Sequence, residues 1–532
     1  MIKQLKAPAV MLAATVALTG CDLLDVSNPN NLVEASIRNE AAASAVVNGS
    51  LALVSSSISQ SWQPYLVASD ELYWIGSRDA WGSLDQGFVD DPLNEFIDGP
   101  FPALGQARWM SDEAVEILAG HVAESPSTAM TYDLARANLY SGIQYMLIGE
   151  TQEDFAFSDK TEDGPPVGPA NMFQVLDGAI SRLDAAVSGA NAVGDADLAM
   201  RAMAIRARAH QSRAIWDAIN PSPSGNGLVN AAAAAADANA VIAAAGGATA
   251  DWTYNLTYSS GTVSNSMASW VNDRKENQID LSIVTVDAAN DINGIALMDP
   301  IDNVADPAVI RILNQWKGGN YLSKGGVYEP MTVSSTRLMH LILAENALAG
   351  GNNAGFTEHI NHIRSMDGST LFSGQISNMD MLKHTRRVNV MLQGLRLGDM
   401  YRFGIQASDW SNLAVTSSGP GEMLPISIIE IRANCHLNGL GGGGGGPLRG
   451  RKRRAHPYLV CGCASSFSVT DLQISDDETQ SSRRARFRGA RCGLRMRSVR
   501  RSHPESHFFP SGWGNRNRGE CHLLHAVRCW SE

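Results

Sequence analysis

The sequence predicts a mostly α-helical fold of stacked helical hairpins with a smaller, irregular insertion that contains strands. Three observations predict it. Apolar residues recur at helical spacing through most of 30–250 and 334–404, glycine- and proline-rich breaks separate these segments, and residues 251–333 lose the periodicity. With 532 residues, of which 44% are hydrophobic, the chain can bury a sizeable core.

Residues 1–20 have the features of a signal peptide. Lys3 and Lys6 give a positive start, Ala7 to Leu18 is apolar, and small residues precede Cys21. This order resembles a bacterial lipobox, which implies that Cys21 carries a lipid after cleavage. The apolar run is shorter than the ~20 residues that span a bilayer, and we expect no later stretch to be long and apolar enough to cross one. We therefore expect the mature protein to be held on a membrane by its lipid.

The body begins with four segments of helical periodicity. The first follows Ser125-Pro126, the second follows 164–169, the third carries Leu198 to Ala209, and the fourth is the alanine-rich stretch 231–245. Their apolar positions recur three or four residues apart: Leu139, Ile143, Met146; Val175, Leu176, Ala179, Leu183; Leu198, Ala202, Ile205, Ala209. Small residues on these faces let neighbouring helices approach closely, as stacked hairpins such as tetratricopeptide repeats require.

The insertion and the later helices follow. Residues 252–254, 278–286 and 327–333 favour strands or extended loops, with Gly and Asn between them. Helical spacing returns at Leu338, Leu341 and Ile342 and, after Gly350-Gly351, at Phe356, Ile360 and Ile363. The spacing from Val388 onward predicts one last long helix that ends at Gly404, followed by a closing segment over 405–440.

Several of these stretches resemble the SusD/RagB family of outer-membrane nutrient-uptake lipoproteins, in the family's order, over residues 21–440. The matching stretches are Cys21 to Pro29, Arg136 to Glu150, Leu341 to Leu348, Glu358 to Arg364 with Gly368, Arg386 to Gly404, and Leu424 to Asn434. Three positions depart from the family pattern. Met366 and Gln393 stand where an Arg and a Glu are usual, and Cys435 stands where a Pro is common.

The resemblance implies a function in uptake. A SusD-like lipoprotein is anchored in the outer membrane, faces the cell exterior and covers a SusC-like TonB-dependent transporter, to which it delivers oligosaccharides or peptides. The family pattern also includes Arg396, Asp399 and Arg402, three residues apart on the predicted helix. We expect them to form a structural charge ladder, because a carboxylate between two arginines should have a low pKa and transfer protons poorly.

Aromatic residues are the candidate ligand contacts. Sugars stack on aromatic rings while polar side chains satisfy their hydroxyls. The candidates lie in segments without clear periodicity: Tyr73, Trp74, Trp81, Trp270, Trp316 and Tyr321. For any single residue among them, a place in the core is the stronger interpretation; the hypothesis depends on the group lying in loops.

Other chemistries have little support in the sequence. His359 and His362 are three apart, but no third metal ligand is evident nearby, and we expect no metal and no cofactor. Adjacent acidic pairs such as Asp70-Glu71 point in different directions and suggest solvated surface rather than catalysis, so we do not expect an enzyme. Two alternatives stay open: a helical-repeat scaffold that binds only proteins, and a helical glycoside hydrolase.

The chain changes character after the glycine run 441–446. From Arg449 onward there are sixteen Arg and one Lys against seven Asp and Glu, a net charge of +10 that leaves −22 for the acidic residues before it. An acidic body is a poor partner for nucleic acid. The tail is either a basic binding segment or the product of a reading-frame slip in the G-rich codons of the glycine run. We favour the slip, since out-of-frame GC-rich DNA encodes Arg far more than Lys.

Overall fold

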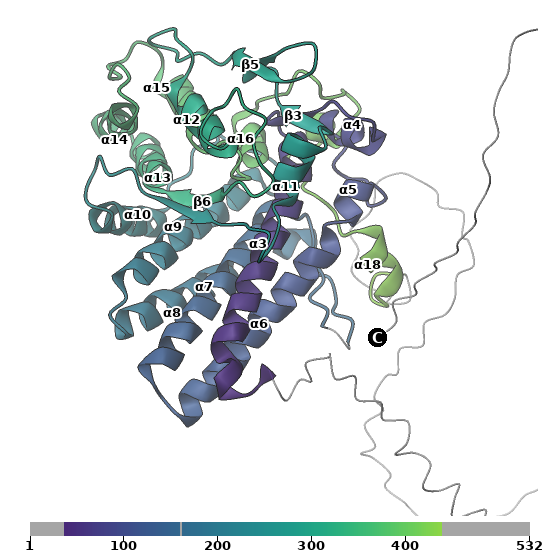
Figure 1. Ribbon diagram of the computed structural model, residues 1–532. Helices are drawn as coiled ribbons and strands as arrows, with labels where there is room; N and C mark the ends of the chain where they lie inside the picture. Colours follow the sequence, from purple (N-terminus) through teal and green to yellow (C-terminus); the bar gives the residue numbers. More distant parts are fainter. Residues whose placement is uncertain (1–36, 160–161, 439–532) are drawn as a thin grey trace, which may run out of the picture. The chain divides into compact units, whose positions relative to one another are not determined.

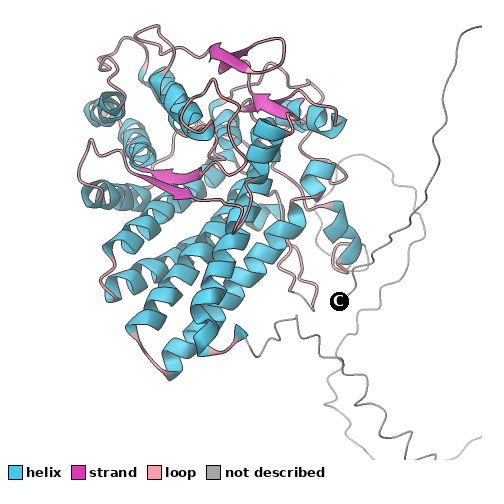
Figure 2. Cartoon of the chain, viewed as in Figure 1, coloured by secondary structure: helices cyan, strands magenta, loops and turns pink. Residues whose placement is uncertain are grey.

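The computed structural model describes residues 37–159 and 162–438, and these fall in one compact unit. The predicted lipid-bearing Cys21, the signal peptide and the tail 441–532 lie outside the described residues. Within them, long helices dominate and the strands are short, as Figure 2 shows. The mostly α-helical fold predicted from the sequence is confirmed.

Five long helices form the first half of the fold and run side by side in the lower part of Figure 1. They are α3 (Ala43–Val67), α6 (Phe101–Glu124), α7 (Thr128–Thr151), α8 (Phe173–Ala192) and α9 (Ala196–Ile219). Successive helices from α6 to α9 pack on one another, and α3 packs on both α6 and α7. Short helical turns accompany them: η2 (Glu40–Ala42), α4 (Asp79–Asp85), α5 (Glu95–Asp98) and η3 (Pro169–Asn171).

Glycines bring α7 and α8 together. A Cβ on Gly142 would lie 2.6 Å from the Leu183 side chain, and one on Gly149 would lie 2.6 Å from Leu176. The side chain of Ser127 caps α7 by accepting a hydrogen bond from the Met130 amide. The prediction that small residues permit close helix packing therefore describes this contact well.

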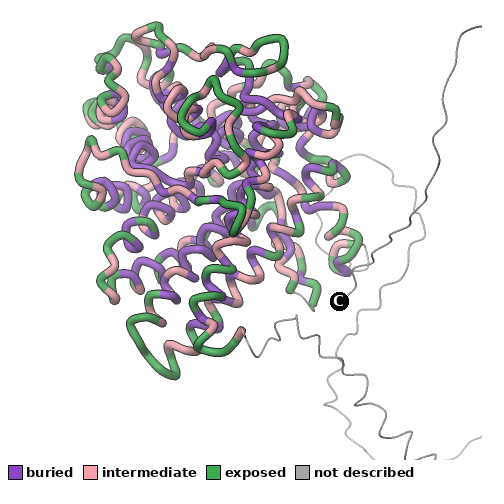
Figure 3. The backbone as a smooth tube through the Cα atoms, viewed as in Figure 1, coloured by how far each residue is buried: buried purple, intermediate pink, exposed green. Residues whose placement is uncertain are grey.

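The second half adds shorter helices, most of them in the upper left of Figure 1. They are α10 (Ala232–Ala244), α12 (Pro307–Trp316), α13 (Thr336–Ala349), α14 (Asn353–Met366), α15 (Asn378–Asn389), α16 (Arg396–Phe403), α17 (Val415–Ser418) and α18 (Ile428–Ala433). Helices α13 and α14 form a hairpin, and α10 joins it to α9. Figure 3 shows buried backbone along the inner faces of the helices.

One expected helix is in fact two. The spacing from Val388 predicted a continuous helix to Gly404, but α15 ends at Asn389 and α16 begins at Arg396. Leu392 and Gly394 between them have positive φ angles of 60° and 68°, which no right-handed helix contains. Gly404 does end the second helix in the left-handed conformation, with φ 63°.

The insertion 251–333 supplies most of the strands. These are β2 (Thr253–Leu256), β3 (Asn277–Ile279), β4 (Val284–Val286), β5 (Ile292–Ile295) and β6 (Met331–Ser335), with α11 (Ser266–Ala268) and η4 (Ser269–Asp273) between them. All pairing is antiparallel: β2 with β6, β4 with β5, and β3 with β1 (Leu72–Trp74) far upstream. The expected strand 278–286 is thus two strands with different partners. The β1–β3 pair joins the insertion to the helical frame.

Within 37–159 and 162–438, one helical stretch, Glu40–Val67, is long and apolar enough to cross a membrane, so the expectation that no such stretch follows the signal peptide was wrong. The same stretch serves as a core helix here. It buries Trp62 and Tyr65, and its Gln63 side chain donates a 2.7 Å hydrogen bond to Asn277 of β3. Ala, Val and Ser give this helix its hydropathy, and close packing against α6 and α7 explains why small residues predominate.

Candidate functional site

A polar pocket lies where the β1–β3 pair meets α15 and the loop after α16. It encloses about 630 Å³. Its walls come from segments far apart in sequence: Asp70, Asp85, Asp280, Ser282, Arg387, Arg396 and 405–409. Carboxylates, guanidinium groups and a hydroxyl make this pocket suited to a polar, hydroxyl-bearing ligand.

Two arginines fix the base of the pocket. Arg396 donates to both carboxylate oxygens of Asp70, at 2.8 and 3.0 Å. The Arg387 guanidinium lies 3.5 Å from the same carboxylate and donates a 2.5 Å hydrogen bond to the hydroxyl of Ser282. Asp70 itself has a positive φ of 55°. Since Asp70 holds both cations, the pocket presents a rigid donor surface on this side.

Two other carboxylates face the pocket, and within the described residues neither forms an ion pair. Asp85 accepts a 3.2 Å hydrogen bond from the Trp74 amide, and Asp280 accepts one of 2.8 Å from the Ser282 amide. Burial, with smaller contributions from nearby Asp409 and Asp280, raises the pKa of Asp85 to about 7. Burial likewise raises the pKa of Asp280. Both carboxyls keep hydrogen-bonding capacity for a ligand.

Tyr73 does not line this pocket, but among the predicted aromatic residues it is the one whose pKa responds to two of the pocket carboxylates. It sits in β1 opposite Gln278 of β3, two residues before Asp280. Its pKa is raised by burial and then by the charges of Asp280 and Asp85. The half-buried ring therefore lies beside the two carboxyls, in the combination of aromatic face and hydroxyl acceptors that sugar binding uses.

The other upstream aromatics form a cluster of their own. Trp81 is buried, stacks on Phe96 with ring centres 3.7 Å apart, and meets Trp270 edge-on at 5.9 Å. Trp270 is half-buried, with the Arg274 guanidinium 4.0 Å from its ring centre. Trp74 covers Gly82, where a Cβ would lie 2.7 Å from the indole. The fold thus brings Trp81 and Trp270 together although they are about 190 positions apart, but the rings of this cluster pack against other side chains of the protein.

Trp316 and Tyr321 lie apart from this cluster. Trp316 ends α12 and is 3% exposed, with its carbonyl accepting a 3.3 Å hydrogen bond from Asn272. Tyr321 is half-buried, and its amide donates to the Asn314 side chain. The aromatic group predicted to lie in loops is therefore divided among a strand, three helical segments and a loop. Trp81 and Trp316 have no open ring face for a ligand.

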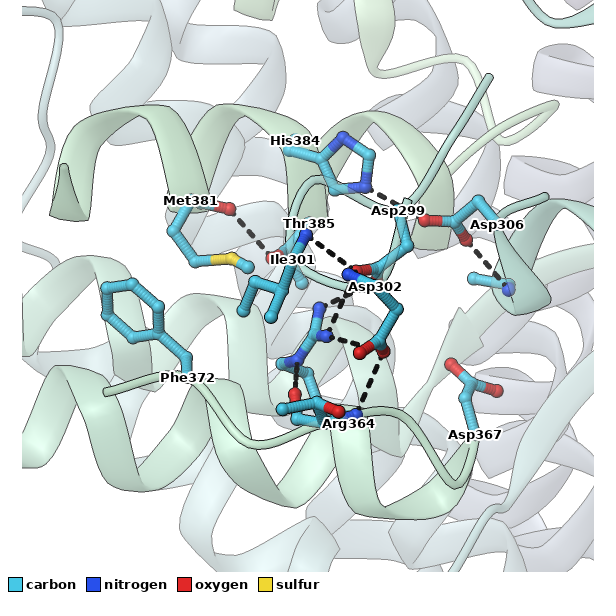
Figure 4. Close-up of polar contacts among 12 residues, drawn as sticks. Asp299, Ile301, Asp302, Asp306, Arg364, Asp367, Phe372, Met381, His384 and Thr385 are labelled. Atoms are coloured by element: carbon cyan, nitrogen blue, oxygen red, sulfur yellow. Dashed lines mark hydrogen bonds and ion pairs between the residues drawn. The ribbon is translucent and has the colours of Figure 1, made fainter. Parts of the chain in front are cut away.

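A second polar cluster, drawn in Figure 4, has the residue types of a metal site. Side-chain oxygen and nitrogen atoms of Asp299, Asp306 and His384 lie within 4.8 Å of one another. Arg364 already occupies both oxygens of Asp299, at 2.8 and 3.1 Å, and Asp306 caps α12 while it accepts a 2.8 Å hydrogen bond from His384. These pairings hold the loop at 299–302 against α14, which is a structural role.

Comparison with known proteins places the fold. No family model matches the sequence, and no curated protein matches it. Among solved structures, a SusD superfamily protein from Bacteroides thetaiotaomicron superposes with a TM-score of 0.53 at 14% identity. The match covers 74% of this chain and 98% of that one.

The chain has the SusD fold. Further SusD superfamily proteins, from Bacteroides vulgatus and Bacteroides fragilis, both give TM-scores of 0.50, at 13% and 12% identity. They cover 75% and 74% of this chain and 98% of their own. The resemblance predicted from motif order is confirmed at the level of the fold.

The segment that carries the strongest motif resemblance, Arg386 to Gly404, contains a network of buried ion pairs. Asp399 accepts hydrogen bonds from Arg386 and Arg402 at 2.8 Å, and burial is outweighed by these cations, so its pKa is lowered. Arg402 also pairs with Glu345 of α13. Arg396 points elsewhere, to Asp70. The expected charge ladder is therefore a network across helices, in which Arg386 takes the place expected for Arg396.

The sequence alone did not reveal most of the residues that line the pocket. Asp70-Glu71 was assigned to solvated surface, yet Glu71 is 1% exposed and Asp70 pairs with two arginines. Asp85 and Asp280 carry no local signal, because their proximity depends on the β1–β3 pairing. The Arg386-Arg387 pair inside the family motif was the one available sign that a charged partner lay nearby.

Proposed function

We propose that this protein is an outer-membrane, lipid-anchored binding protein that captures oligosaccharides and delivers them to a TonB-dependent transporter. The observation that carries the proposal is the pocket lined by Asp85, Asp280 and Arg387, with Tyr73 of β1 close enough for both carboxylates to affect its pKa. A neutral glycan would stack on the ring, donate hydroxyls to the carboxyls and accept from the guanidinium. The SusD fold, together with the lipobox-like sequence before Cys21, supports a place at the cell surface.

The chemistry of the pocket favours glycans over peptides. Peptide backbone needs paired donors and acceptors along a groove, whereas these side chains converge on one point. The two raised carboxyl pKa values also resemble the acid–base pair of a glycosidase, so release of reducing ends is measured alongside binding. Turnover would replace the binding proposal with the hydrolase alternative.

Calorimetric titration of the full chain with a glycan panel tests the proposal. We expect at least one neutral oligosaccharide to bind, without cleavage. Tyr73→Ala and Asp280→Asn should each weaken that binding by about tenfold, the effect of losing ~1.4 kcal/mol from a stacking or hydrogen-bonding contact.

Tyr132→Ala is the matched control. Tyr132 is a 37% exposed tyrosine on α7, which does not line the pocket, and its removal should leave the affinity unchanged. A panel without any binding glycan, combined with recovery of a protein partner, would favour the protein-only scaffold. Equal losses in the Tyr73 and Tyr132 variants would place binding elsewhere.

A further inference from the structure

Three histidines gather where α13 meets α14. His340 comes from α13, and His359 and His362 lie three residues apart on α14. The ring centre of His340 is 5.4 Å from that of His359 and 5.1 Å from that of His362, and the two α14 rings are 6.1 Å apart. The third ligand that the sequence did not reveal is thus supplied by the neighbouring helix.

The hydrogen bonds of His340 fix which nitrogen can bind a metal. Its Nε2 lies 2.9 Å from the carbonyl oxygen of Ala248. Since a carbonyl only accepts, Nε2 carries the proton and Nδ1 presents its lone pair. Metal-binding histidines commonly donate their second nitrogen to a carbonyl in this way, which orients the ring.

The spacing of the nitrogens fits a shared ion. Nδ1 of His340 lies 3.2 Å from Nδ1 of His359. Two nitrogens bound to one tetrahedral Zn²⁺ at 2.0–2.1 Å are about 3.4 Å apart. The same distance fits a hydrogen bond between the rings, which is the structural interpretation against which a metal site must be tested.

His340 is also ready to bind without losing a proton. Burial, followed by the neighbouring His359 and His362, lowers its pKa to about 4. The ring is therefore neutral near pH 7, as a metal ligand must be. His359 and His362 are only partly buried, so an ion can reach them from solvent.

His362 has room to adjust. Its side chain is 27% exposed, and its Nε2 lies 3.7 Å from Oε1 of Glu358, a residue that is itself 66% exposed. In the present conformation its nitrogens do not join the other two within ligating distance, so binding requires this ring to turn. Glu358 or water would complete four-coordination.

We propose that His340, His359 and His362 bind Zn²⁺ or a similar transition-metal ion between α13 and α14. Unlike Asp299 and Asp306, whose oxygens are taken by Arg364, a helix cap and His384, Nδ1 of His340 faces Nδ1 of His359. The ion would link the two helices and stabilise the folded state in proportion to its occupancy.

Zinc binding by the chelator-treated full chain tests this site. Competition with a chromophoric chelator counts the ions bound by the natural chain and by the variants His359→Gln and His362→Gln, singly and together. We expect the double variant to bind one Zn²⁺ fewer, and each single variant to bind that ion at least tenfold more weakly, as loss of even an outer-shell partner does. Histidines and cysteines in the tail are common to all these proteins and cancel in the difference.

His210→Gln, a change to a half-buried histidine on α9, should bind as many ions as the natural chain. Co²⁺ provides a second readout, because a tetrahedral site gives visible absorption that should disappear in the double variant. His340→Gln, if it folds, should lose the ion as well, but the two α14 variants decide without it. Equal zinc counts in the natural chain and the double variant would overturn the proposal.

Discussion

The buried carboxyl of Glu71 makes the stability of this fold depend on pH. Its side chain is 1% exposed, one oxygen accepts a 3.2 Å hydrogen bond from the Leu392 amide, and the other has no hydrogen-bond partner within the described residues. Burial raises its pKa to about 8, although Arg396 lowers it in part. The folded protein therefore holds a proton on Glu71 that the unfolded chain releases at lower pH.

The raised pKa of Glu71 makes the stability of the folded state fall as pH rises. A carboxyl with a raised pKa contributes stability that is complete below its ordinary value and is lost as pH rises through about 8. Glu71→Gln stays neutral throughout, so the free energy of unfolding of this variant relative to the natural protein should rise between pH 5 and pH 9. The gain should reach a few kcal/mol, at about 1.4 kcal/mol per pKa unit.

Thermal and urea unfolding across this pH range measure the difference. Glu95→Gln is the control, since Glu95 is 52% exposed and pairs only with the exposed Arg78. Its difference from the natural protein should stay flat. A flat difference for Glu71→Gln as well would show that Glu71 is ionised in the folded state.

At the scale of elements, the break between α15 and α16 separates what the sequence predicts from what it does not. Helical spacing predicts each helix, because its apolar positions follow from local geometry. The break depends on Trp62 of α3, whose indole lies where a side chain on Gly394 would point. A contact between residues more than 300 positions apart leaves no periodic signal, so the helical spacing predicted one continuous helix through Gly394.

Gly394→Ala tests this explanation. A Cβ there would lie 2.5 Å from Nε1 of Trp62, in a residue whose φ is already 68°. We expect unfolding to become easier by about 2–4 kcal/mol, from left-handed strain plus overpacking. Gly404→Ala shares the positive φ of 63° but meets no atom within 4 Å, so it should cost only about 1–2 kcal/mol. Equal losses in denaturant titrations would mean that the contact with Trp62 contributes nothing.

At the scale of the whole molecule, the helices position the short segments that line the polar pocket. Strand β1 follows α3 directly, and its pairing with β3 brings Tyr73 beside Asp280. Helices α15 and α16 then add Arg387 and Arg396 to the lining. The sequence predicted the fold and one aromatic residue near this pocket, but it did not predict which charged residues line it, because local patterns do not encode which loops meet.

We propose that a glycan binds in this polar pocket. Hydrogen exchange of the full chain, with and without the tightest-binding oligosaccharide, tests it most directly. We predict slower amide exchange in residues 70–75, 280–282 and 405–409 when the glycan is present, with the helices α7 and α8 unchanged. Protection confined to other segments, or none at saturating glycan, would contradict the account.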